Sequence, residues 1–300
     1  MLRRFLLTLL ASFFIPMAAP SQETMVGVLE EVPGSYVGES NWYGVRVIFK
    51  KAAGAWWAFP DDCRDEGCLK AIAKEFPSET LWSIAFDGKS LGQIRAKTPR
   101  EFSFYSQIGL QKVTNSNAVP SVGKPSLDYS GFLVTPVHRP LVAISQPYFK
   151  DPDHWKPSTL SPTLLTLVRQ QFRTKFPKLC RSPKEDASTL EPFPYRNEDV
   201  QLAKAYISGT GWFVVRLHLG GAVECGGQES GFQLDDPWFT ITPEKSSDYL
   251  NSGIWLVDAG DYDNDGKSEV LFSVSRYDRG GYILYYDDFK KQLSFEFSYH

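Results

Sequence analysis

The sequence lacks the residue patterns that mark common hydrolase and zinc sites. Its four histidines show neither His-x-x-x-His spacing nor a flanking glutamate, and they are His138, His154, His218 and His300. No Gly-x-Ser-x-Gly nucleophile elbow is found, because the glycines around Ser230 have a different spacing. Asp153 and His154 could supply an acid and a base from one loop. A secreted or periplasmic hydrolase with an unlocated active site is therefore the alternative to the function expected below.

The start of the chain lacks an apolar run long enough to cross a membrane as a helix. A span needs roughly 20 apolar residues, and the run Phe5–Ile15 is about half that length. Two arginines precede this run, and the small residues Ala19 and Ser21 follow it. This order predicts a signal peptide over residues 1–21, export to the periplasm or the extracellular space, and no membrane span after cleavage.

An excess of positive charge is also missing. The chain has 32 Lys and Arg against 35 Asp and Glu, a formal net charge of −3. Removing residues 1–21 takes away two arginines and no acid, which leaves 32 − 2 = 30 basic residues against 35 acidic ones and a net charge of −5. Bulk electrostatics of this sign predicts that the protein has no nucleic-acid partner.

Cysteines are few but even in number. In a chain expected to be exported, the set Cys63, Cys68, Cys180 and Cys225 predicts two disulfides. Cys63 and Cys68 enclose a short loop, so their bridge would fix local shape more than global stability. Cys180 would then pair with Cys225. A zinc site is not favoured, because Cys-x4-Cys lacks a second matching pair.

Alternating apolar residues bounded by turn residues predict a mainly β fold with antiparallel sheets. Apolar residues make up 42% of the chain and aromatic residues 14%, enough for a packed core. The strongest hairpin signal is Asp87-Gly88 between strands 80–86 and 91–96. Other strands are expected at 43–49, 55–59, 141–145, 200–207, 212–219, 238–241, 253–257, 270–275, 281–286 and 293–299.

One long helix is expected around residues 163–176. Its apolar residues recur at helical spacing, Ser161 is placed to cap it, and Pro162 suits its first turn. Prolines are frequent between 120 and 162, where we expect loops and edge strands rather than central strands.

Two packed halves are expected, which could form a degenerate, propeller-like arrangement. Residues 22–160 would form an N-terminal β-rich domain, and residues 161–198 a helix and linker. Residues 199–300 would form a C-terminal β domain.

Aromatic residues divide into an expected core and an expected surface. Six tryptophans on predicted strands are assigned to the core: Trp56, Trp57, Trp82, Trp212, Trp238 and Trp255. Four tyrosines near the carboxyl end are assigned to a binding surface for a protein or carbohydrate ligand: Tyr282, Tyr285, Tyr286 and Tyr299.

An acidic stretch between two predicted strands carries the clearest chemistry. It reads Asp261-Tyr-Asp263-Asn-Asp265-Gly-Lys267-Ser-Glu269. Counting Asp261 as position one, carboxylates fall at positions one, three, five and nine, and Lys267 offers its main-chain carbonyl at seven. Oxygen-only ligands in a flexible loop suit calcium better than zinc or iron.

The flanks of this stretch exclude the helix-loop-helix type of calcium site. Phe272 occupies position twelve, where that motif needs a bidentate Glu, and both flanks have strand patterns. A strand-loop-strand calcium site is therefore predicted. The alternative is a hairpin turn at Asn264-Asp265-Gly266 whose acids face water.

The residues from Gly260 to Phe272, followed by Arg279-Gly-Gly-Tyr-Ile-Leu-Tyr285, resemble one FG-GAP (VCBS-type) repeat of the integrin-alpha kind, over residues 254–289. In those families the loop binds calcium between two strands of a β-propeller blade, in surface or extracellular proteins concerned with adhesion and ligand binding. The resemblance implies that the ligands are Asp261, Asp263, Asp265, Glu269 and the Lys267 carbonyl. We expect an exported, non-enzymatic binding or structural protein with a calcium-stabilised loop.

Overall fold

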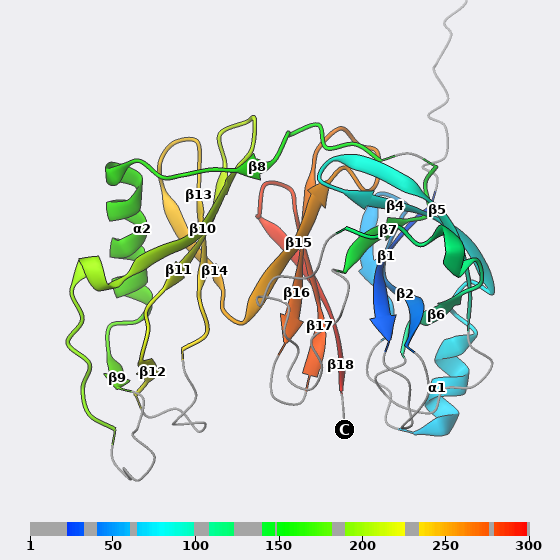
Figure 1. The fold of residues 1–300 in the computed structure, drawn as a ribbon, viewed down its shortest axis with the longest axis horizontal. Helices are drawn as coiled ribbons and strands as arrows, with labels where there is room; N and C mark the ends of the chain where they lie inside the picture. The colour runs from blue at the N-terminus through cyan, green and yellow to red at the C-terminus, as the bar shows by residue number, and fades with distance from the viewer. Residues whose placement is uncertain are drawn as a thin grey trace, which may run out of the picture.

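Antiparallel β-sheets and one long helix make up the fold, as the sequence predicts. The computed structural model describes residues 23–32, 41–60, 65–98, 108–122, 140–147, 149–181, 190–225, 234–275 and 279–298. Figure 1 shows a barrel at one end of the molecule, a four-stranded sheet in the middle, and a five-stranded sheet covered by helix α2 at the other end. The expected signal peptide lies outside the described residues.

Six strands of the first half close into the barrel. Their order is β1-β7-β4-β5-β6-β2, and β2 pairs back with β1. They are β1 (Thr24–Val32), β2 (Trp42–Ala52), β4 (Glu79–Phe86), β5 (Lys89–Lys97), β6 (Leu110–Val113) and β7 (Leu141–Ile144). Strand β3 (Ala55–Ala58) extends β2 as a hairpin, and the short helix α1 (Glu66–Ala73) follows.

The Asp87-Gly88 turn joins β4 to β5, which confirms the expected hairpin. Both residues have positive φ, 51° and 70°, as two-residue hairpin turns of this type require. The expectation of only edge strands between 120 and 162 is wrong for β7, which pairs with both β1 and β4. The prolines flank the four residues of β7 without entering it, so both of its edges can hydrogen-bond.

The five-stranded sheet has the order β14-β13-β11-β10-β8. Its strands are β8 (Lys156–Pro157), β10 (Gln201–Ile207), β11 (Phe213–His218), β13 (Trp238–Ile241) and β14 (Ser247–Asn251). Helix α2 (Pro162–Lys175) begins where predicted, with Ser161 Oγ accepting from the Leu164 amide at 3.4 Å. Its buried residues Val168 and Phe172 pack against one face of this sheet, in a cluster that includes Phe239. No helix in the described ranges is long and apolar enough to span a bilayer.

The central sheet is a four-stranded meander with both faces covered. It runs β15 (Ile254–Gly260), β16 (Glu269–Ser275), β17 (Arg279–Tyr286) and β18 (Lys291–Ser298). Side chains alternate strictly along β16: Leu271 faces the cluster shared with the barrel, and Phe272 faces the cluster shared with the five-stranded sheet. The sheet is therefore buried between its two neighbours.

This double coverage overturns the expected tyrosine surface. Tyr282 and Tyr285 are only 5% and 3% exposed, because β17 is an inner strand of the covered sheet. The Tyr282 hydroxyl donates a 2.5 Å hydrogen bond to Glu30 of the barrel. Tyr286 is half-buried, and Tyr299 lies outside the described residues.

The expected tryptophan core is confirmed at three of the six positions. Trp82, Trp238 and Trp56 are buried, and Trp212 and Trp255 are partly buried. Trp57 is 56% exposed, which contradicts the prediction. Neighbouring residues of a strand point to opposite faces, and on β3 Trp56 takes the inner one.

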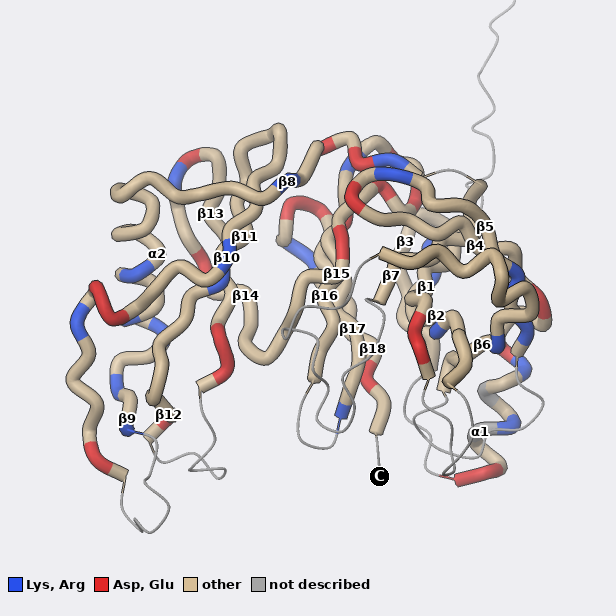
Figure 2. Tube along the Cα trace, viewed as in Figure 1, with Lys and Arg blue, Asp and Glu red and all other residues tan. Residues whose placement is uncertain are grey.

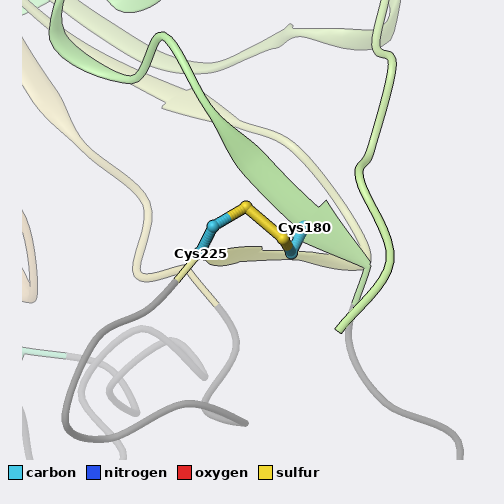
Figure 3. Close-up of a disulfide and its surroundings, with 2 residues drawn as sticks. All are labelled: Cys180 and Cys225. Carbon is cyan, nitrogen blue, oxygen red and sulfur yellow. A yellow bond between two sulfur atoms is a disulfide. The ribbon is translucent and has the colours of Figure 1, made fainter. Parts of the chain in front are cut away.

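A disulfide joins Cys180 to Cys225, as predicted (Figure 3). Cys180 lies in β9 (Leu179–Arg181), and Cys225 directly follows β12 (Ala222–Glu224). The two strands pair with each other, and the two Cα atoms are 5.2 Å apart. Cys63, the expected partner of Cys68, lies outside the described residues.

Candidate metal centre

The acidic stretch forms the loop between β15 and β16. Gly260 and Glu269 are the last paired residues of the two strands, so residues 261–268 make the connection. Asn264 and Gly266 have φ values of 61° and 91°. These left-handed conformations are accessible to Asn and Gly, and they fold the loop back on itself.

Backbone amides inside the loop hold the acids in place. Asp261 accepts from the amides of Asp265 and Gly266, both at 3.0 Å. Asp263 Oδ1 accepts from the Asp265 amide at 3.1 Å, and Asp265 Oδ1 accepts from the Lys267 amide at 2.9 Å. The loop thus wraps around its own carboxylates, rather than leaving all of them in water as a plain acidic turn would.

Three carboxylates come together as a result. One oxygen from each of Asp261, Asp263 and Asp265 lies within 4.8 Å of the other two. Glu269 lies outside this group of three at the base of the loop, where it is 3% exposed and its Oε2 accepts from the Tyr262 amide at 2.8 Å. The structure thus brings three of the five predicted ligand residues together and buries the fourth carboxyl nearby.

The buried acids carry an electrostatic penalty. Burial raises the pKa of Glu269 well above its usual value, and the neighbouring Asp263 adds to the rise. Burial also raises the pKa of Asp261, although the amides of Gly266 and Asp265 partly offset this. Negative charge is therefore costly here unless a cation sits beside it.

A segment from the proline-rich region clamps the loop. The Ser268 hydroxyl donates to Asp151 Oδ1 at 2.6 Å, and the Ser268 amide donates to Asp153 Oδ2 at 3.0 Å. Asp151 Oδ2 also accepts from the Trp155 amide at 2.6 Å. Figure 2 shows acidic segments gathered near the upper end of β15, on the side of the barrel. The pair considered for catalysis is divided: Asp153 fastens the loop, while His154 is exposed.

The same segment packs directly on the start of the loop. The Lys150 carbonyl accepts from the Asp261 amide at 2.9 Å. A Cβ atom on Gly260 would lie only 2.2 Å from the Phe149 ring, so glycine is required for this approach. Tyr262, which is fully buried, stacks on Phe149 with a centroid distance of 6.0 Å.

The barrel contributes a cation to the loop. Lys51, near the end of β2, places Nζ 2.5 Å from Asp263 Oδ2, with the two side chains 21% and 2% exposed. The same oxygen is buried and has no hydrogen-bond partner in the part of the chain that the structure describes. The contact between Lys51 and Asp263 is therefore an ion pair.

No protein-family model, curated protein or solved structure matches this chain. The inference of function therefore depends on the residues themselves. The donor set consists of oxygens alone, and Asp263 Oδ2, buried beside the Lys51 ammonium, accepts no hydrogen bond from the residues that the structure describes. These features fit a hard divalent cation such as calcium.

Sequence reasoning missed three residues at this centre. Asp151, Asp153 and Lys51 lie far from the loop in the sequence, and only the fold brings them to it. The repeated acids in Asp151-Pro-Asp153 are a local signal for loop structure, but they do not indicate which element they contact.

Proposed function

We propose that this protein is an exported, non-enzymatic binding or structural module that holds Ca²⁺ in the loop between β15 and β16. Asp261, Asp263, Asp265, Glu269 and the Lys267 carbonyl would hold the ion. Its chemistry would be structural: it would neutralise the acids and order the loop, because binding free energy adds to folding free energy.

One observation carries this proposal. The oxygens of three aspartates from a single eight-residue connection gather within 4.8 Å, although their mutual repulsion opposes it. The loop amides that point at Asp261 and Asp263 favour this arrangement before any ion arrives.

The surroundings of the loop favour a role as a clip between parts of the fold. Segment 149–155 connects the barrel to the five-stranded sheet, and Lys51 belongs to the barrel. Both contact a loop of the central sheet. An ion that orders the loop would therefore stabilise contacts among all three sheets.

The shape of the carboxyl-terminal half supports the FG-GAP resemblance as part of the proposal. Strands β15–β18 form a four-stranded antiparallel meander, with the acidic loop between its first two strands. Strands β10, β11, β13 and β14 form a second meander packed against it. A blade-like module of this kind would present its ligand-binding surface outside the cytoplasm, to a protein or a carbohydrate.

Calorimetry with and without calcium tests this function. For an affinity of the weak extracellular class, about 5 mM calcium should stabilise the protein by about 1 to 2 kcal/mol relative to excess chelator. Asp265→Asn, which keeps an oxygen for the Lys267 amide, should lose most of this gain. Asp288→Asn, an exposed acid in the β17–β18 turn, should keep it. Equal calcium responses of the two variants would contradict the proposal.

A further inference from the structure

The contact between Lys51 and Asp263 joins a strand of the barrel to the candidate ion loop. We propose that the Lys51 ammonium is the resident cation of this loop in the metal-free protein, and that Ca²⁺ must displace it. This inference rests on the proposed calcium site and adds a residue that sets its affinity.

Geometry places the ammonium where it neutralises the loop. Lys51 Nζ is 2.5 Å from Asp263 Oδ2, and the Asp263 side chain is 2% exposed. A buried carboxylate strongly favours a cation at this distance, because water cannot screen it. Asp263 is also one of the three acids whose oxygens meet, so the lysine touches a ligand residue itself.

Like charges make lysine and calcium competitors rather than partners. An ammonium in contact with one carboxylate of a three-carboxylate group repels a divalent ion bound to the same group. Lysine also has no acceptor with which it could help to coordinate the metal.

The structure offers Lys51 a second position. Its Nζ is already 5.2 Å from the centroid of the Trp56 ring, within the range of a cation–π contact. A displaced ammonium can stay over this ring while it leaves Asp263. Trp56 is 7% exposed and belongs to the core cluster shared by the barrel and the central sheet. Calcium binding would thereby move a side chain at the barrel, which couples the loop to the first half of the molecule.

The test is calcium titration calorimetry on chelator-stripped full chain, comparing the native protein with Lys51→Met and Lys50→Met. Lys50→Met is the matched control, because this substitution removes the same charge from the same strand. The Lys50 side chain lies over the Phe59 ring. Lys51→Met should bind calcium at least about tenfold more tightly than the native protein, whereas Lys50→Met should stay within about twofold. In excess chelator, Lys51→Met should have the lower melting midpoint, because its acids have lost their cation.

Three outcomes separate the possibilities. Equal affinities for Lys51→Met and Lys50→Met, or weaker binding by Lys51→Met, would overturn the displacement while leaving the calcium site in place. No heat of binding for either the native protein or Lys51→Met in millimolar calcium would overturn the proposed function itself. If Lys51→Met folds only when calcium is present, that result supports the inference, and Lys51→Gln then provides the affinity comparison.

Discussion

The Ser268 hydroxyl donates a 2.6 Å hydrogen bond to Asp151 Oδ1, across 117 residues of sequence. This bond fastens the loop between β15 and β16 to the segment that leaves the barrel. Ser268→Ala should cost about 1.5 to 3 kcal/mol of unfolding free energy, because it leaves a partly buried carboxylate oxygen without its donor. Urea unfolding in chelator measures the change.

A serine in an exposed turn provides the control for this prediction. Ser246 bonds Thr242 at the surface, and Ser246→Ala should change stability by less than about 0.5 to 1 kcal/mol. Equal losses for the two alanine variants would show that the bond between Ser268 and Asp151 does not help to clamp the loop.

Glycine at position 260 is predicted to be indispensable for packing. Gly260→Ala would place a Cβ atom 2.2 Å from the Phe149 ring, and overpacking of this kind costs about 1 to 3 kcal/mol or more. Gly266→Ala should be unfavourable for a different reason, since its φ of 91° strains any L residue while no atom lies within 4 Å of the new methyl group.

Double-mutant cycles with Phe149→Ala distinguish the two causes. Removing the ring should relieve Gly260→Ala, with a coupling energy above about 1 kcal/mol, and should leave the cost of Gly266→Ala unchanged within about 0.5 kcal/mol. Additive losses at position 260 would contradict the packing of Phe149 on the loop.

The raised pKa of Glu269 predicts an unusual dependence on pH in the absence of calcium. The folded protein holds the Glu269 proton more tightly than the unfolded chain does. Below the ordinary carboxyl pKa the group is protonated in both states, so the cost of burying a charged Glu269 is absent there. Stability should then fall as pH rises from the ordinary value toward the raised folded value. Asp261, whose pKa is also raised, contributes in the same direction.

Glu269→Gln isolates this effect. In chelator at pH 7.5, the variant should melt at a higher temperature than the native protein, and its midpoint should vary less between pH 4.5 and about 7.5. With calcium, the native protein should melt at a higher temperature than the variant, because its Glu269 carboxylate binds the ion and the glutamine of the variant does not. A variant that is less stable than the native protein in chelator would refute the assignment of an electrostatic penalty to Glu269.

The disulfide between Cys180 and Cys225 should contribute substantially to stability. It spans 45 residues, and closure of such a loop in the unfolded chain is worth about 4 kcal/mol. Replacing both cysteines by alanine should lower the free energy of unfolding by roughly 2 to 5 kcal/mol. Denaturant unfolding of the double variant, compared with the native protein in its oxidised form, gives the value. A loss below about 1 kcal/mol would mean that the bridge adds little to the β9–β12 pairing.

Local sequence patterns were sufficient to predict much of this fold. Asp87-Gly88 defines a hairpin because both residues tolerate positive φ, and Ser161-Pro162 marks the start of α2 because a cap and a rigid φ belong there. The positions of Asp261, Asp263 and Asp265 likewise predicted a loop that draws its own acids together.

Local sequence patterns could not predict that the barrel closes or that both faces of the central sheet are covered. The pairing of β1 with β7 depends on residues more than a hundred positions apart, and the expected strands did not include β1. Alternation in β17 reveals two faces but not that both are covered, so Tyr282 was wrongly placed on the surface. Lys51 carries no local signal for contact with Asp263.

A crystal structure of the protein grown with millimolar calcium tests the central claim most directly. The account predicts anomalous calcium density about 2.3 to 2.6 Å from oxygens of Asp261, Asp263, Asp265 and Glu269 and from the Lys267 carbonyl, with Lys51 Nζ moved away from Asp263. Clear density for the loop with no calcium peak, and with Lys51 still in contact with Asp263, would contradict it.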